Sequence, residues 1–395
     1  MRAPPLSLYI HIPWCVRKCP YCDFNSHAQR GALPVDEYVA ALLADLDRDL
    51  AAIDASVAGR ALASIFFGGG TPSLFAPDVI ARILDGVAAR IGVEDGAEIT
   101  LETNPGTVEH GRFDGYLAAG VDRLSFGVQS FDDAALAQLG RIHSAAEAER
   151  AVKSAQDAGY DNLNLDLMYA LPRQALAGAL ADLERALALQ PAHISHYQLT
   201  LEPNTVFAAK PPPLPDEDSA WDMQEACQAR LAEGGFMQYE VSAYAQGGAR
   251  RSAHNLNYWR FGDYVGIGAG AHGKLSDPAS GEIVRTTKLK VPQGYLARAA
   301  RGEDFGSRQR VDPAELPFEF MLNALRLVEG VPTALFTART GIAEEAIAPV
   351  LVDQRARGWL EADPARIRPT PLGRRFLNDL MAAWLPPKAS LRAAS

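Results

Sequence analysis

The chain has 395 residues, of which 48% are hydrophobic and 22% are charged, so it can bury a large core and hold more than one domain. Its formal net charge of −10 excludes a global positive field that attracts nucleic acid or anionic lipid. The N-terminal sequence MRAPPLSLYIHIPW carries one arginine and an apolar run that ends at Pro13, which is typical neither of a signal peptide nor of a membrane span. We therefore expect a soluble cytoplasmic protein, with its four cysteines in a reducing compartment.

Residues 6–199 alternate apolar, strand-like runs with segments of helical period. Successive β–α units with right-handed crossovers predict a parallel sheet buried on both faces, which binds ligands at the carboxyl ends of its strands. Six units, fewer than the eight of a closed barrel, predict an α/β fold with an open partial (β/α)6 barrel. The strands are expected at residues 6–12, 63–67, 98–102, 123–128, 162–168 and 193–199, and the helices at 35–53, 77–91, 109–119, 132–139, 145–158 and 176–189.

A proline-rich break at residues 210–215 ends these repeats. The segment 214–234 then has the pattern of one helix, with Asp216 or Asp218 as its cap. Cys227 is isolated within that pattern, and we assign it to the core because a lone helical cysteine is usually a buried residue.

The composition changes from about residue 313, where a helix–helix–helix–hairpin order resembles a winged-helix domain. Local arginines add positive charge, but the acidic residues between them favour a packing or lid role over DNA binding. We therefore expect a partial barrel at residues 1–209, an extension of the barrel at 210–312 and a winged-helix-like domain at 313–395. In this last domain the helices are expected at 318–328, 332–340, 344–358 and 372–384, and the hairpin at 360–371.

Three cysteines follow the first predicted strand with the spacing C-x3-C-x2-C: Cys15, Cys19 and Cys22. Three thiolates on so short a loop can close around one metal centre with little loss of chain entropy. They are one short of the four thiolates that usually hold an electron-transfer iron–sulfur cluster, so a cubane bound here leaves one iron open for another ligand. The alternatives are a zinc site completed by His11 or His27 and, less favoured, a disulfide.

Polar residues stand at the ends of the later strands, where a buried parallel strand does not need them. The glycines at 68–70, followed by Thr71 and Pro72, either form a tight turn or let the backbone approach a ligand closely. Polar groups at the mouth of a barrel are costly unless they pair with each other or with a ligand. The further rim residues favour a ligand with amine, carboxylate and ribose groups, and they are Glu102, Gln129, Arg141 and Asp166.

These motifs together resemble the radical S-adenosylmethionine (radical SAM) family, in its subfamily of oxygen-independent coproporphyrinogen III oxidase-like proteins. The resemblance covers about residues 6–385 and rests on IHIPWC, FFGGGTPS, LETNP, LSFGVQSF, LGRIH, NLDLMYALP and YQLTLEPNT. It implies a partial barrel, a [4Fe–4S] cluster on the three cysteines and SAM on the open iron, with some further contacts to a second SAM that only the oxidase is expected to use. The residues at SAM-contacting positions of the family are Tyr9, Tyr21, Gly70, Thr71, Pro72, Glu102, Gln129, Arg141 and Asp166.

One departure separates this chain from the oxidase itself. The oxidase carries a further cysteine two residues after the last cluster cysteine, whereas this chain has Phe24, which can neither ligate metal nor relay protons.

The string HNLNYW at 254–259 also resembles the HNxxYW motif associated with heme binding in the heme-chaperone branch of the family. Histidine is a common ligand of heme iron and aromatic rings pack on the macrocycle, although a histidine among aromatics is more often a core residue. The resemblance implies heme contacts for His254, Tyr258 and Trp259.

The string GIGAGAH at 266–272 has the glycine content of a dinucleotide-binding loop. Such a loop needs a strand–turn–helix frame, and residues 274–281 have the pattern of a turn, so we reject this function. His272 is free to border the heme or substrate space, although nothing in the sequence requires it.

The sequence favours a heme chaperone that carries a SAM-ligated cluster and transfers heme to acceptor proteins, with a cluster-dependent homodimer left open and no nucleic-acid partner. The enzyme alternative is oxidative decarboxylation of coproporphyrinogen III through a 5′-deoxyadenosyl radical, against which Phe24 argues. The third alternative is a nucleic-acid-associated protein that acts through the winged-helix-like domain, against which the net charge of −10 argues.

Overall fold

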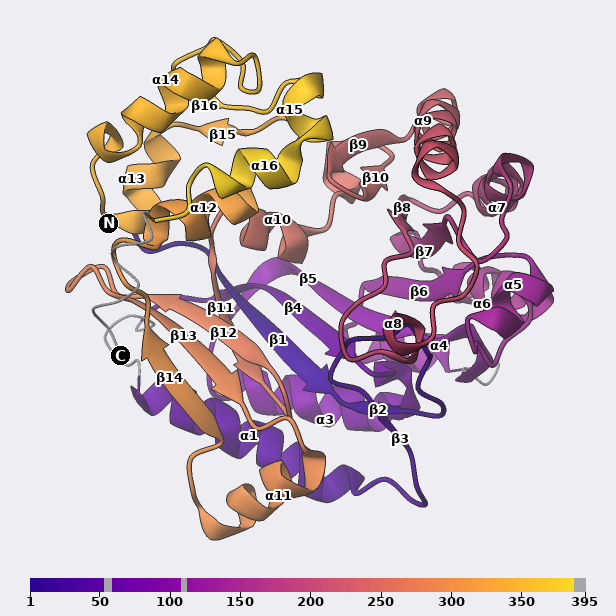
Figure 1. The fold of residues 1–395 in the computed structure, drawn as a ribbon. Helices are drawn as coiled ribbons and strands as arrows, with labels where there is room; N and C mark the ends of the chain where they lie inside the picture. The colour runs from indigo at the N-terminus through magenta and orange to yellow at the C-terminus, as the bar shows by residue number, and fades with distance from the viewer. Residues whose placement is uncertain (53–58, 108–111, 387–395) are drawn as a thin grey trace.

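The computed structural model describes residues 1–52, 59–107 and 112–386, and one twelve-stranded sheet runs through it (Figure 1). Six of its strands lie side by side and parallel, in the order β1-β4-β5-β6-β7-β8. The sheet ends at β14 on one side and β9 on the other, so the described part of the barrel is open, as predicted. The six strands match the predicted ones and span β1 Leu6–Ile12, β4 Leu62–Gly69, β5 Val93–Thr103, β6 Arg123–Gln129, β7 Leu163–Tyr169 and β8 His193–Gln198.

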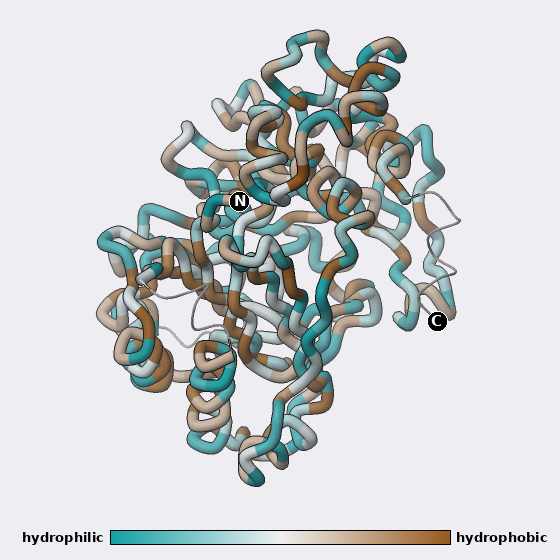
Figure 2. The backbone as a smooth tube through the Cα atoms, turned by 90° about the vertical axis from the view of Figure 1, so that its left-hand side faces the viewer, coloured by the Kyte–Doolittle hydropathy of each residue, from teal (hydrophilic) through white to brown (hydrophobic). Residues whose placement is uncertain are grey.

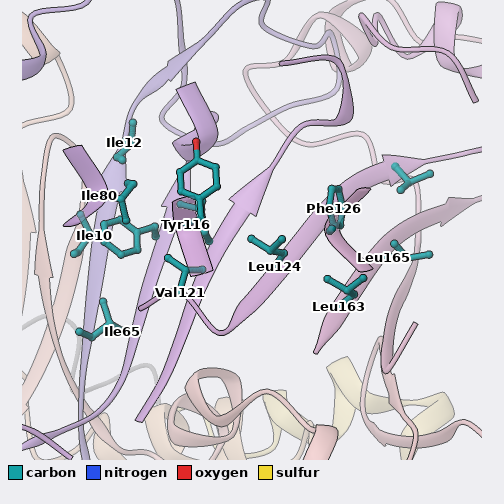
Figure 3. Packing of buried hydrophobic residues seen from close by; sticks show 14 of the residues in the cluster. Ile10, Ile12, Ile65, Ile80, Tyr116, Val121, Leu124, Phe126, Leu163 and Leu165 are labelled. Atoms are coloured by element: carbon teal, nitrogen blue, oxygen red, sulfur yellow. The ribbon is translucent and has the colours of Figure 1, made fainter. Parts of the chain in front are cut away.

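Helices cover the outer face of this sheet, because alternate strand residues on that face are apolar. Ile10 and Ile65 point outward from β1 and β4, where Ile80 of α3 and Tyr116 of α4 pack around them (Figure 3). All four side chains are at most 1% exposed, and truncating such a residue to alanine typically costs about 2–5 kcal/mol. The predicted helices are present, except that residues 53 and 109 lie outside the described part of the chain. They span α1 Val35–Ala52, α3 Pro77–Ala88, α4 Phe113–Ala118, α5 Asp133–Gln138, α6 Ala145–Asp157 and α7 Leu176–Ala188.

The inner face of the same strands is buried, as predicted, but many of its residues are polar. Ser7 of β1 lies opposite Ser64 of β4, and their hydroxyl oxygens are 2.8 Å apart. On β7 the Asn164 amide donates to Asp166 and to Ser125 of β6, both at 2.8 Å. An apolar outer face and a polar inner face are the pattern of a sheet that surrounds a hydrated or ligand-filled interior. Figure 2 shows hydrophobic and hydrophilic residues following one another closely along the backbone.

Residues 237–310 extend this sheet at both edges. β10 and β9 join β8, whereas β11 pairs in parallel with β1 and is followed by antiparallel β12, β13 and β14. The prediction of a turn at 274–281 was wrong for its first residues, because Lys274 to Ser276 belong to strand β12. Lys274 is buried there and forms an ion pair with Asp263 at 2.9 Å. Cys227 is fully buried in α9, as predicted. These elements span β9 Met237–Glu240, β10 Ala243–Ala245, β11 Asp263–Ile267, β12 His272–Ser276, β13 Ile283–Lys288, β14 Gly306–Arg310, α8 Val206–Ala209, α9 Glu217–Glu233, α10 Ala253–Trp259, α11 Pro292–Arg301, and the short strands β2 Trp14–Cys15 and β3 His27–Ala28.

The C-terminal residues form a second hydrophobic core, which α10 joins through Leu256 and Trp259. The predicted helix–hairpin order is present, with an isolated bridge between Leu360 and Pro369, but the last predicted helix is divided at Phe376. This region packs at the amino ends of the strands, beside the start of β1 in Figure 1, so it is not a lid over their carboxyl ends. The last residues of the predicted domain, 387–395, lie outside the described chain. The elements span α12 Leu316–Ala324, β15 Val331–Pro332, α13 Ala334–Thr340, the 3-10 turn η4 Glu344–Ala346, α14 Ala348–Ala356, β16 Arg366–Ile367, α15 Pro371–Arg375 and α16 Leu377–Ala382.

Within residues 1–52, 59–107 and 112–386, no helix combines the length and the apolar composition that crossing a bilayer requires.

Candidate functional site

The cysteine loop lies at the carboxyl end of β1, on the rim where ligands bind to parallel sheets. The short strands β2 and β3 pair with each other and close the loop at its base. Two later segments hold its outer side. The Phe207 amide of α8 donates to the Pro20 carbonyl at 3.0 Å, and a Cβ on Gly140 would lie only 2.8 Å from the Pro20 ring. The loop is thus fixed in place from both halves of the barrel.

All three thiols of this loop are free and partly buried, and each has a different neighbour. The Cys22 sulfur lies 3.5 Å from the Ser26 hydroxyl, and Arg141 donates Nη1 to the Cys19 sulfur at 3.7 Å. Burial raises the pKa of Cys15, an effect that a hydrogen bond with Thr71 partly offsets. Because a thiolate is the metal-binding form, a cationic metal centre supplies the charge that this loop needs to release its protons. Three unpaired thiols on one fixed loop therefore fit a metal cluster and not a disulfide.

Hydrogen bonds engage both histidines of the zinc alternative. His11 uses both ring nitrogens, Nδ1 with the Tyr9 hydroxyl at 3.0 Å and Nε2 with the Asn25 carbonyl at 2.9 Å. Nε2 of His27 lies 3.2 Å from the Lys290 carbonyl. The geometry therefore disfavours a mononuclear zinc site.

The glycine turn at the end of β4 packs directly on the base of the cysteine loop. The Gly70 amide donates to the Ile12 carbonyl at 2.8 Å, and a Cβ on Gly70 would lie 2.5 Å from the Trp14 carbonyl oxygen. Gly69 has φ +117°, and a Cβ there would lie 2.6 Å from the His11 ring. Close packing alone thus requires glycine at both positions, so contact of Gly70, Thr71 and Pro72 with SAM stays a prediction.

Two carboxyl groups face the interior from neighbouring parts of the rim. Glu102 on β5 accepts the Gly69 amide at 3.1 Å, and Asp166 on β7 accepts the Ser125 hydroxyl at 3.2 Å. Burial, followed by repulsion from Asp166, raises the pKa of Glu102 to about 8, and burial also raises the pKa of Asp166. Carboxyl groups that are costly to ionise become charged readily when a cationic ligand group approaches them.

Gln129 and Arg141 show two further marks of a binding site. Gln129 has φ +70°, an unusual conformation for a residue other than glycine, and its Oε1 accepts the Tyr197 hydroxyl at 2.8 Å. Strained backbone of this kind concentrates at functional sites. Arg141 donates Nη2 to the Gly127 carbonyl at 2.6 Å, while its buried Nε has no hydrogen bond within the described chain. A bound ligand is one explanation for such an unsatisfied buried donor.

A pocket of about 410 Å³ opens between this rim and the cysteine loop. Tyr9, Gly69 and Glu102 line its inner end. Phe24 lines the side toward the cysteine loop, and its ring is 62% exposed. Residues from α10 and from the strands after it form the opposite side, and these include Tyr258, Tyr264, His272 and Lys290. A pocket of this volume is within the usual range for small-molecule sites.

The string HNLNYW forms α10, which packs at the amino ends of the strands and places the three predicted heme residues in different surroundings. His254 is 1% exposed, and its Nδ1 and Nε2 each lie 3.0 Å from a hydroxyl, of Ser64 and of Tyr258. Burial lowers the pKa of His254 to about 3. Tyr258 borders the pocket, whereas Trp259 lies against the C-terminal core under the Arg326 guanidinium, 4.3 Å from its ring centre. The structure thus does not bring these three side chains together on one ligand, and iron ligation by His254 requires a rearrangement of both its hydrogen bonds.

Sequence reasoning missed how residues 266–272 meet the cysteine loop. The Asn25 amide donates to the carbonyls of Ala269 and Lys290, at 2.8 and 2.9 Å. A Cβ on Gly270 would lie 2.2 Å from Asn25 Nδ2, so this glycine serves close packing. The rejection of a dinucleotide loop holds, although the reason is that strand β12 follows the turn. Tyr197 was also missed, and the signal that pointed to it was its position two and four residues after Ser195 and His193, whose side chains face the interior polar network from β8.

Comparisons with known proteins agree with this geometry. The Radical SAM superfamily model matches residues 9–185, and the HemN C-terminal domain model matches residues 311–376. The solved structure of coproporphyrinogen III oxidase (HemN) from Escherichia coli has a TM-score of 0.80 over 97% of this chain and 90% of that chain, at 21% identity. These matches define the class, which is a radical SAM fold with a C-terminal domain of the HemN type.

Two relatives narrow this class further. The heme chaperone HemW of Escherichia coli (strain K12) is 50% identical over 385 residues, which are 98% of this chain and 99% of that protein. HemW of Haemophilus influenzae is also 50% identical, over 97% of this chain and 99% of its own length. The chain therefore belongs to the HemW heme chaperone family of radical SAM proteins. The predicted family is confirmed, and the oxidase alternative is not favoured.

Proposed function

We propose that this protein binds heme and passes it to acceptor proteins, with a SAM-ligated [4Fe–4S] cluster as its resident cofactor. The proposed heme site is the pocket between the strand ends and the cysteine loop, called the rim pocket below. The observation that carries the proposal is the exposed Phe24 ring, which borders a pocket continuous with the cofactor rim. An apolar ring that is 62% exposed at a pocket mouth is suited to contact with a flat apolar ligand such as a porphyrin. The names of the relatives, heme chaperone HemW, support this assignment.

Within this proposal, Cys15, Cys19 and Cys22 hold the cluster. The described residues fit it, because the three thiols are free on one short loop and both ring nitrogens of the nearby His11 are already hydrogen-bonded. Cluster and SAM together supply a redox-active centre next to the pocket. The chain itself fixes the loop and presents Arg141, whose buried Nε lacks a partner in the described chain.

The SAM site is proposed on the rim beside the cluster. Glu102 holds its proton near neutral pH, since its pKa is about 8, and an ammonium group placed beside it lowers that pKa and recruits the carboxylate as a partner. Gln129 and Arg141 present polar groups from the other half of the barrel. The full set of proposed SAM residues is Tyr9, Tyr21, Gly70, Thr71, Pro72, Glu102, Gln129, Arg141 and Asp166.

The remaining expectations about organisation and partners stay proposals. The C-terminal residues pack on α10 and share its hydrophobic core, which supports a structural role and not DNA binding. A cluster-dependent homodimer, transfer to acceptor proteins and a cytoplasmic location stay predictions, as do the boundaries at residues 209 and 312.

A titration with hemin tests the proposed function. Full-length protein, reconstituted anaerobically with iron and sulfide and supplied with SAM, is expected to show a broad band near ~400 nm and then a saturable Soret band as hemin is added. Transfer is followed by mixing the loaded protein with an apo-cytochrome b and measuring the acceptor's spectrum. A folded, cluster-loaded protein that binds no hemin at micromolar concentration contradicts the proposal, as does formation of protoporphyrinogen from coproporphyrinogen III with SAM and dithionite.

A further inference from the structure

His272 has the features of an iron ligand on the wall of the rim pocket. It is the first residue of β12, its side chain is exposed, and it lines the pocket together with Phe24 and Lys290. Thr287 is the residue of β13 that pairs with His272, and its hydroxyl lies 3.3 Å from the His272 Nδ1. Nε2 has no hydrogen-bond partner in the described chain. A metal-binding imidazole commonly has this arrangement, with one nitrogen held by a hydrogen bond and the other left for the metal.

The other described histidines are less available. Both ring nitrogens are engaged in His11, in His143, in His193 and in His254. His196 of β8 is 5% exposed, stacks on Tyr169 of β7 and does not line this pocket. His27 donates or accepts through Nε2 at 3.2 Å from the Lys290 carbonyl, and it is not part of the pocket wall. His272 is therefore the described histidine that combines exposure, an available nitrogen and a place on the pocket wall.

The surroundings of His272 match the chemistry of a ferric porphyrin with two carboxylate side chains. Phe24 offers an exposed apolar ring, and Tyr264 adds a second aromatic wall. Lys290 is exposed at the same pocket, whereas Arg285 behind it is already paired with Glu319 and donates to the Tyr264 hydroxyl at 2.7 Å. Cationic side chains of this kind pair with carboxylates. Burial, and then the positive charge of Lys290 and of Arg285, lowers the pKa of His272, so the imidazole is neutral near pH 7.

We propose that heme enters the pocket between Phe24 and β12 with His272 Nε2 as an axial ligand of its iron and with Lys290 beside a propionate. This inference rests on the proposed function and deepens it, because it moves the iron ligand from α10 to the strand β12. It also places heme next to Glu102, and hence next to the proposed SAM site, because Glu102 and His272 line the same pocket. No bond other than the iron–nitrogen coordination forms, and the neutral imidazole needs no proton acceptor.

The test compares His272→Ala with His27→Ala and with the unmodified protein in the same hemin titration. The cluster is reconstituted first in each sample, so that free thiols do not take the hemin iron. We expect His272→Ala to weaken hemin binding by about tenfold or more and to change the ligation-sensitive Soret and visible bands. We expect His27→Ala to leave both unchanged, because its ring does not line the pocket.

A rescue experiment separates ligation from a structural effect. Imidazole added to the His272→Ala protein is expected to restore the bands of the unmodified complex, since it supplies the lost nitrogen, and the ~400 nm cluster band serves as the check that the variant is folded. Saturable binding with an affinity within twofold of the unmodified protein and unchanged bands in His272→Ala would overturn the inference while leaving the proposed function intact. Absence of hemin binding by the unmodified protein would instead contradict the proposed function itself.

Discussion

The two ends of the barrel carry the two most conspicuous motifs of this chain, and they differ in how their polar groups are satisfied. At the carboxyl end, the cysteine loop and the rim hold free thiols, a strained Gln129 and a buried Arg141 nitrogen with no partner in the described chain. At the amino end, the two buried polar residues of α10, His254 and Asn257, are both hydrogen-bonded, and of this helix only the Trp259 indole nitrogen is buried without a partner in the described chain. Asn257 donates to Ser7 at 2.9 Å and to the Asp263 carbonyl at 2.8 Å, and the His254 amide is bonded to Glu98.

This difference teaches which of two similar-looking motifs is ready to bind a ligand. Histidines, cysteines and aromatics have the same appearance in a sequence whether they close a core or line a pocket. A site that binds a ligand retains unsatisfied or costly groups, whereas a structural motif uses its hydrogen bonds internally. By this criterion the carboxyl end is the binding end, and α10 closes the opposite end of the barrel.

The largest expected effect comes from the thiols. Cys19→Ala should abolish the ~400 nm band of the reconstituted protein, because two thiolates cannot hold a cubane that already lacks a fourth protein ligand. The free energy of unfolding of the cluster-free protein should change by less than about 1 kcal/mol, since Cys19 is only partly buried. Iron and sulfide analysis measures the first effect and urea denaturation the second. Cys227→Ala is the control, because the Cys227 thiol is buried in the hydrophobic core beneath α9. This variant should keep the full cluster content. Full cluster content in Cys19→Ala would contradict the assignment.

The next effect tests the amino end. His254→Ala removes a buried ring that stacks on Phe66 at 5.0 Å between centres, and it takes one hydrogen bond each from Ser64, which keeps Ser7, and from Tyr258. We expect a loss of about 2–4 kcal/mol in the free energy of unfolding, measured by urea denaturation.

The matched variant is His272→Ala, which changes the same residue type at an exposed position and should alter stability by less than about 0.5 kcal/mol. Equal stability losses in the two variants would contradict the conclusion that His254 is a structural residue at the amino end whereas His272 is exposed at the carboxyl end.

A smaller effect is expected from the glycine turn that joins β4 to the cysteine loop. In Gly70→Ala the new Cβ would lie 2.5 Å from the Trp14 carbonyl oxygen, so the backbone must shift. We expect a stability loss of about 1–3 kcal/mol together with a lower cluster content per chain. Gly294→Ala in α11 is the control, because nothing lies within 4 Å of its new Cβ, and it should be neutral or slightly stabilising. Urea denaturation and iron analysis of both variants provide the comparison, and equal results for the two would remove the packing argument.

The smallest effect concerns pH and Glu102. Its pKa is raised from 4.5 to about 8 in the folded chain, so between these values the unfolded chain loses a proton that the folded chain retains. Its contribution to stability is therefore fully present below pH 4.5 and is lost as the pH rises to about 8. Because the carboxyl borders the pocket, solvent reduces the size of this change to the order of 1–2 kcal/mol.

Glu102→Gln should remove this part of the pH dependence, so the variant should gain stability over the unmodified protein as the pH rises from 5 to 8. Urea midpoints measured at several pH values for both proteins give the difference, and Glu94→Gln, at an exposed position of β5, is the control. Parallel curves for the unmodified protein and Glu102→Gln would show that Glu102 titrates near its ordinary pKa.

The sequence by itself determined the parallel strands, their helices, the cysteine loop and the family. Apolar runs of strand length and helical period repeat regularly over residues 6–199, and the C-x3-C-x2-C spacing depends only on neighbours along the chain. Local order of this kind is encoded in short segments, so it can be derived without knowing the fold.

Only the tertiary structure decided which histidine faces the pocket, that β11 joins β1, and that the C-terminal domain packs at the end opposite the cysteine loop. His254 and His272 are eighteen positions apart, and nothing in their immediate neighbours shows that one bonds Ser64 while the other lies beside Phe24. Burial and hydrogen bonding of a side chain depend on residues far away in the sequence, and these come together only when the sheet curves around its interior.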